Sequence, residues 1–182
     1  MANSFRILAG SVLFVLSMLI LKRRYKTSAF DIGLTIQNWQ TILIVGTIIG
    51  FLQSIIITIP SIEFFPAFNI SFGPPGSLWR HPLIMSLSLI AGAVVIPACE
   101  ELICRGVFYG WLRKRMRMGL AIAVNTLIFT GLHGIHPRAI VAFVLSIVTC
   151  SLYEKTGSLL LCIVIHSTCN FSIVIIRFIL LD

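Results

Sequence analysis

The stretch Cys99-Glu100-Glu101-Leu102-Ile103-Cys104-Arg105-Gly106 places three ionisable side chains inside an apolar run that begins near Pro82 and ends at Arg113. The whole chain has only six acidic residues, and two of them stand side by side here. A carboxylate or an arginine at the centre of a bilayer costs about 2.5–3.5 kcal/mol on insertion scales. A chain rarely carries three such groups without using them, so this stretch indicates a functional site.

Helical spacing separates the two carboxylates. Glu101 and Arg105 are four residues apart, so on a helix they share one face and can form an ion pair. Glu100 lies about 100° further round the helix and is free to face another group. Pro97 lies three residues before Glu100 and predicts a kink that frees backbone carbonyls beside the acidic pair.

The composition is that of an integral membrane protein. Of the 182 residues, 58% are hydrophobic and 11% are charged, which excludes an ordinary soluble domain and predicts one integral membrane domain, residues 1–182. The net charge is +8, but eight of the fourteen Lys and Arg fall in the clusters Lys22–Lys26 and Arg113–Arg117. Both clusters adjoin apolar spans, as the positive-inside rule describes, so we expect no nucleic-acid partner.

The pattern of apolar runs predicts an all-α, polytopic membrane helix bundle with an intramembrane polar site. Proline, glycine and charge clusters separate about six transmembrane helices, at Phe5–Leu21, Thr41–Ile59, Pro82–Leu112, Gly119–Gly134, Ala139–Tyr153 and Ser158–Leu181. We expect Pro60 to end the second span. The first span lacks a small-residue cleavage site before Lys22, so we interpret it as retained rather than as a signal peptide.

Small residues within the apolar runs are expected to serve packing. Gly106 and Gly110 are four residues apart, a spacing that allows close helix contact. The cysteines match no zinc or redox spacing and are interpreted as small buried hydrophobic residues. They are Cys99, Cys104, Cys150, Cys162 and Cys169.

The basic clusters give an expected orientation. With Lys22–Lys26 inside, the alternation of spans also puts Arg113–Arg117 inside and the proline-rich segment Ser61–His81 outside.

Depth in the bilayer predicts that separate helices share one polar cluster. Glu101, His133 and His166 lie roughly 12–21 Å from the cytoplasmic ends of their helices, at ~1.5 Å per residue. All three therefore fall near the middle of a hydrocarbon core that is ~30 Å thick.

These side chains suit the activation of water. The ion pair with Arg105 leaves Glu100 as the carboxylate that can act as a general base, and His133 can orient the water or carry the proton. His166 and Asn170 are four residues apart on one face of the last span, and both can donate to a developing oxyanion.

A metal-based chemistry uses the same residues. Glu100, His133 and His166 would make a two-His-one-carboxylate set for Zn²⁺ with an open fourth position. No His-Glu-x-x-His motif is present, and the ligands would come from separate helices. Water held by protein groups and water held by zinc therefore both stay open.

Three motifs occur in order along the chain: Glu100-Glu101-x-x-x-Arg105, Phe129-x-x-x-His133 and His166-x-x-x-Asn170. They resemble the three motifs of the CPBP family of intramembrane proteases, which includes the type II CAAX prenyl endopeptidases and the bacterial Abi proteins. The resemblance covers about residues 82–171, the expected catalytic core. One departure is Cys104, which stands where relatives often have an aromatic residue.

The resemblance implies an intramembrane endopeptidase, in a family with a metalloprotease label, whose site opens toward the cytoplasm. It also implies a bacterial inner membrane and substrates that are membrane-embedded or lipid-modified peptides. The N-terminal half is short compared with larger CAAX proteases, which leaves prenylated substrates open. The implied roles are Glu100 and His133 as activators of water, Glu101 and Arg105 as supports, and His166 and Asn170 as oxyanion donors.

Two other kinds of protein fit the same sequence. A non-catalytic membrane immunity or regulatory protein could keep the fold without turnover. A transporter could use a buried Glu and His as a proton relay, although the chain has no evident inverted repeat.

Overall fold

The computed structural model describes residues 33–34, 37–64, 82–134 and 138–181, and each of its elements is helical. The elements are α2 (Trp39–Phe64), α3 (Pro82–Ile90), η2 (Ala91–Val95), α4 (Ile96–Glu101), η3 (Leu102–Tyr109), α5 (Gly110–Arg113), α6 (Met118–Leu132), α7 (Arg138–Thr156) and α8 (Leu159–Leu181). The predicted all-α bundle is confirmed for these residues. Phe5–Leu21, Lys22–Lys26 and most of Ser61–His81 lie outside them.

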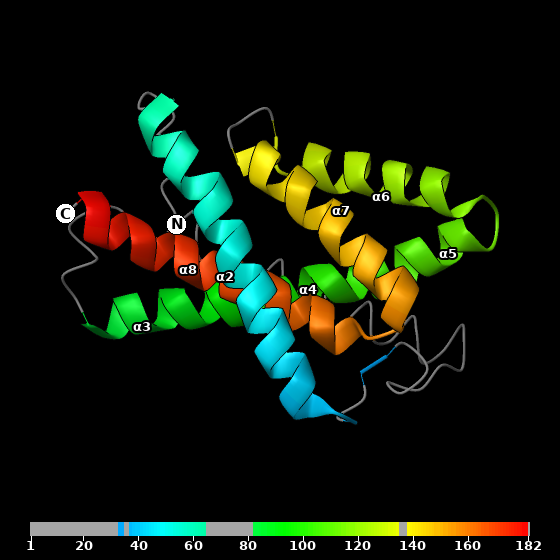
Figure 1. Ribbon diagram of the computed structural model, residues 1–182, viewed down its shortest axis with the longest axis horizontal. Coiled ribbons are helices and arrows are strands. Elements are labelled where there is room, and N and C mark those ends of the chain that lie inside the picture. The colour runs from blue at the N-terminus through cyan, green and yellow to red at the C-terminus, as the bar shows by residue number, and fades with distance from the viewer. Residues whose placement is uncertain (1–32, 35–36, 65–81, 135–137, 182) are drawn as a thin grey trace.

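Helix α8 is the centre of the bundle (Figure 1). It contacts α2, α7 and the segments η2, α4 and η3. Its side chains at intervals of four residues are buried against α7 and α2, as expected for one apolar face of a helix. The buried members of this core are Val141, Leu145, Leu161, Ile165, Cys169 and Ile173.

The chain is an integral membrane protein. Among the described residues, three helices are long and apolar enough to cross a bilayer, namely Trp39–Thr58, Ala139–Thr156 and Leu159–Ile176. Met118–Leu132 is a shorter apolar helix, and the segments from α3 to α5 follow one another without a gap. Each predicted span from Thr41 onward therefore coincides with a helix or a helical run.

Pro60 does not end the second span as predicted, because α2 continues past it to Phe64. A proline inside a helix removes one backbone hydrogen bond. Membrane helices tolerate this loss because neighbouring groups can satisfy the freed carbonyl.

The predicted interruption at Pro97 takes the form of a π-helical stretch. This stretch, η2, lies directly before α4, in which Pro97 is the second residue. The N–H of Ile96 donates to the Ala91 carbonyl, five residues back. In the same register Pro97 would pair with Gly92, but proline has no N–H. The Gly92 carbonyl is therefore available to a donor from another helix.

Two glycines let α2 and α8 approach closely. A Cβ atom at Gly46 would lie 2.7 Å from Val164 Cγ1, and one at Gly50 would lie 2.5 Å from the Ile165 carbonyl oxygen. These glycines are four residues apart, which is the small-xxx-small pattern of membrane helix pairs. The prediction of close packing at Gly110 was wrong, because a Cβ there would meet nothing within 4 Å.

We expect Gly50→Val to destabilise the bundle by forcing α2 away from the α8 backbone. Overpacking of this kind costs about 1–3 kcal/mol. Thermal unfolding of the purified protein in detergent should show a lower Tm. Gly119→Ala is the matched control, because a Cβ at Gly119 would meet nothing within 4 Å. Equal Tm values for Gly50→Val and Gly119→Ala would contradict the close contact.

Candidate active site

A fully buried ion pair occupies the middle of the bundle. Glu101 at the end of α4 and Arg105 in η3 have side chains that are 0% exposed, and Arg105 Nε lies 3.1 Å from Glu101 Oε2. Their spacing of one helical turn brings the two groups together, as the sequence predicts. An unpaired charge in this position would be costly, so each residue requires the other.

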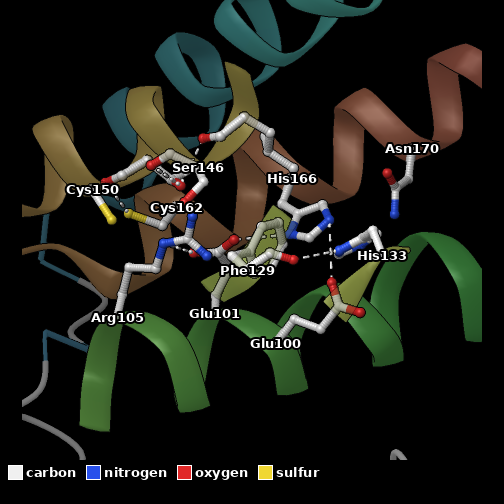
Figure 2. A network of polar contacts seen from close by, with 12 residues as sticks. Glu100, Glu101, Arg105, Phe129, His133, Ser146, Cys150, Cys162, His166 and Asn170 are labelled. Carbon is white, nitrogen blue, oxygen red and sulfur yellow. Dashed lines mark hydrogen bonds and ion pairs between the residues drawn. The ribbon is translucent and has the colours of Figure 1, made fainter. Parts of the chain in front are cut away.

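His166 of α8 joins both carboxylates (Figure 2). Its Nδ1 lies 2.8 Å from Glu101 Oε1, and its Nε2 lies 3.7 Å from Glu100 Oε2. Glu101 is already ion-paired with Arg105, and a carboxylate in an ion pair only accepts hydrogen bonds. The His166 Nδ1 therefore donates, which fixes the orientation of the ring and leaves Nε2 directed toward Glu100.

Glu100 is the open member of the acidic pair. Its side chain is 31% exposed, whereas that of Glu101 is 0% exposed. The divergence of neighbouring residues around the helix explains the difference. Glu101 is committed to two partners within the bundle, and Glu100 keeps a carboxylate that a substrate or a water molecule can reach.

His133 lies just beyond the end of α6, not within a span that runs to Gly134 as predicted. Its backbone N–H donates to Thr130, and its ring Nδ1 lies 2.8 Å from the Phe129 carbonyl oxygen. The last carbonyls of a helix have no partner inside the helix, and a carbonyl can only accept. Nδ1 therefore donates to this carbonyl, and Nε2 is the ring nitrogen that is left for another partner.

The Phe129 ring contacts three other side chains of the site. Its ring centroid lies 4.7 Å from that of His133 and 6.0 Å from that of His166. On the same ring, the Arg105 guanidinium carbon lies 4.7 Å from the centroid, within the range of a cation–π contact. Phe129 itself is 2% exposed. One buried ring thus brings both imidazoles and the guanidinium together.

Asn170 lies one turn after His166 on α8 and faces η2. Its Nδ2 donates to the Gly92 carbonyl over 3.1 Å. This is the carbonyl that Pro97 leaves without its own N–H donor. A side-chain amide has two N–H groups, so Asn170 keeps a second donor after this bond.

Five of the six predicted site residues thus lie on the facing sides of the α4–η3 segment and α8, and His133 lies just beyond the end of α6. Glu100, Glu101, Arg105 and His166 form one connected network. His133 joins them through the Phe129 ring, and Asn170 extends the site toward η2. The arrangement provides an accessible carboxylate, two imidazoles and a side-chain amide, which are the groups that peptide hydrolysis by water needs.

A family model for Rce1-like type II CAAX prenyl endopeptidases matches residues 82–172, which is half of the chain. The chain belongs to this family. The match includes the three sequence motifs and therefore confirms the resemblance that they carry. At the level of the family, the protein is a CAAX-type intramembrane protease. No curated protein and no solved structure gives a significant match to the chain.

The described part of the chain has no group of three His, Cys, Asp or Glu side chains that could hold a metal ion. His166 presents Nδ1 to Glu101, and His133 presents Nδ1 to a backbone carbonyl. The Nε2 atoms and the Glu100 carboxylate are left, and among the described residues they form no group that could hold a metal ion. We therefore derive no step through a metal.

Two further polar groups join neighbouring helices of the bundle, and the motifs in the sequence do not include them. Asn125 donates from α6 to the Cys104 carbonyl over 2.8 Å. Nearer the end of the helical run, Glu154 of α7 accepts from Tyr109 over 2.8 Å and pairs with Arg113 at 2.9 Å. A lone amide inside an apolar span was the available sequence signal for Asn125.

We expect Glu101→Gln to destabilise the protein strongly and Glu100→Gln to leave stability almost unchanged. Removing one partner of a buried ion pair strands the other charge, at about 3–5 kcal/mol. Thermal unfolding in detergent should show a large fall in Tm for Glu101→Gln. Glu100→Gln is the matched control, because it makes the same chemical change at a partly exposed neighbour. Similar Tm values for the two variants would contradict the separate roles of the carboxylates.

Proposed function

We propose that the protein is an intramembrane endopeptidase that hydrolyses membrane-embedded or lipid-modified peptides with a water molecule held by protein side chains. The observation that carries this proposal is the contrast within the acidic pair. Glu101 is buried and committed to Arg105 and His166, while Glu100 is 31% exposed beside the same histidine.

In the proposed first step, Glu100 and His133 activate the water. The Glu100 carboxylate accepts a proton from the water, and the free Nε2 of His133 orients the water or takes part in the proton transfer. The water oxygen attacks the carbonyl carbon of the peptide bond. The products of this step are a tetrahedral intermediate with an oxyanion and a protonated general base.

In the proposed second step, His166 and Asn170 stabilise the oxyanion. Because Nδ1 of His166 donates to Glu101, Nε2 can also donate only when the ring is an imidazolium. Carboxylates lie on both sides of the ring, Glu101 beside Nδ1 and Glu100 beside Nε2. The second N–H of Asn170 is the other donor.

The intermediate then collapses with cleavage of the C–N bond. The proton that the general base took from the water passes to the leaving amine. The new carboxyl group and the new amine account for all atoms of the water, and the enzyme returns to its starting protonation state.

The surroundings of the site support a membrane-associated substrate. The site lies among apolar helices that a water-soluble peptide would not enter readily. The basic residues after α5 support a site that opens toward the cytoplasm of a bacterial cell. Among them, Arg115 stacks on Trp111, with its guanidinium carbon 4.1 Å from the ring centroid, as an interfacial anchor would. The matched family is described as prenyl endopeptidases, which supports prenylated peptides as candidate substrates.

The proposal is tested with purified protein in liposomes and a library of membrane-tethered and prenylated peptides. We expect wild type to cleave at least one peptide, and Glu100→Gln and His133→Ala to reduce kcat about 10²–10⁴-fold, because general-base catalysis contributes that much. Glu154→Gln is the control, since it removes another partly exposed carboxylate at a site joined to Tyr109 and Arg113.

Each reaction is repeated with a chelator, and we expect the wild-type rate to be unchanged. Loss of cleavage with the chelator, and its return with Zn²⁺, would contradict water held by protein groups. Absence of cleavage across the library, or equal rates for wild type and Glu100→Gln, would contradict the protease and favour a non-catalytic immunity or regulatory protein.

A further inference from the structure

Asn125 is a buried amide that joins α6 to η3 and to α7. It lies within α6 and is 1% exposed. Its Nδ2 donates to the Cys104 carbonyl of η3 over 2.8 Å, and its Oδ1 accepts from the Cys150 thiol of α7 over 3.3 Å. Both ends of the amide are therefore used, and each contacts a different neighbouring helix.

Both contacts of Asn125 lead directly to Arg105. Cys104 is the residue before Arg105, so the bond to its carbonyl fixes the backbone from which the arginine side chain extends. The Cys150 thiol lies beside the guanidinium, on the side away from Glu100 (Figure 2). Asn125 is therefore bonded to the backbone next to Arg105 and to a thiol beside the Arg105 guanidinium.

Arg105 has few other polar restraints. Its Nε pairs with Glu101, but neither terminal nitrogen has a hydrogen-bond partner among the described residues. The guanidinium otherwise contacts the Cys150 thiol and the face of the Phe129 ring. Because the guanidinium has so few polar contacts, its position depends on that of its backbone and of the adjacent thiol.

We propose that Asn125 and Cys150 are positioning residues for the active site. They hold Arg105 so that its Nε meets Glu101, which in turn holds Nδ1 of His166 and directs Nε2 toward Glu100. This inference rests on the proposed protease function for its effect on catalysis. Its structural part, control of the His166 ring from α6, holds independently of turnover.

A purely structural role for Asn125 predicts a different result. An interhelical hydrogen bond that only joined α6 to η3 would change Tm and nothing else. A positioning role requires that the His166 ring and kcat change in protein that is still folded. The readouts are therefore side-chain ¹⁵N NMR of histidine, with His166 assigned from the His166→Gln spectrum, and kcat and KM on the best-cleaved prenylated peptide.

We expect Asn125→Leu, a variant of similar size without hydrogen-bonding groups, to shift the His166 ring signals and to lower kcat about 10- to 100-fold with KM little changed, the scale of a small misplacement of catalytic groups. Thr126→Val is the matched control. Its hydroxyl is equally buried, on the same helix, with no hydrogen-bond partner among the described residues.

Cys150 provides a second pair of variants in case Asn125→Leu fails to fold. Cys150→Ala removes the donor to Asn125 and should shift the same His166 signals. Cys150→Ser keeps a donor and should restore the wild-type spectrum and most of the activity. Rescue by a conservative change is not expected of a residue that only fills space.

The outcomes separate this inference from the proposed function. Unchanged His166 signals in both folded Asn125→Leu and folded Cys150→Ala would overturn the positioning role, whether or not the protein is a protease. Shifted signals in a protein that cleaves no peptide would support the positioning role and contradict the proposed function. Shifted signals with unchanged kcat would overturn the catalytic part of the inference.

Discussion

The ion pair between Glu101 and Arg105 is the interaction on which the rest of the site depends. Two charges with no exposed surface carry a large desolvation penalty, and good geometry and additional partners are needed to offset it. The partners come from other helices: His166 from α8 and the ring of Phe129 from α6. The pair thus forces three segments of the chain to meet at one point inside the bundle.

Interruptions of one helical run supply the backbone groups that complete the site. The segments between Pro82 and Arg113 include two π-helical stretches, η2 and η3. Each presents a carbonyl to an asparagine from another helix, Gly92 to Asn170 and Cys104 to Asn125. Stretches of this kind occur often at functional sites. In this bundle they let α6 and α8 bond directly to the backbone on either side of the acidic pair.

Much of the fold, and which residues meet at the candidate site, could be predicted from the sequence. Apolar runs locate the helices, and the spacing of Glu101 and Arg105 predicts their pairing. The remaining features depend on which helices become neighbours, and local sequence patterns do not contain that information. Phe129 is a motif position in the sequence, but its contacts with Arg105 and both imidazoles depend on the neighbouring helices. The close contacts of Gly46 and Gly50 likewise depend on the position of α8. The sequence did not predict that α6 ends at Leu132, so it could not place His133 beyond the end of the helix. The catalytic roles of these residues stay predictions.

The central claim is that Glu100 activates water and does not itself attack the substrate. A single turnover in H₂¹⁸O, with enzyme in excess over a cleaved peptide, tests this most directly. The account predicts that ¹⁸O enters the new carboxyl group of the product and that mass spectrometry finds no label in the Glu100 side chain. Label in the Glu100 side chain after one turnover, with enzyme oxygen in the product, would indicate a covalent acyl intermediate and contradict the account.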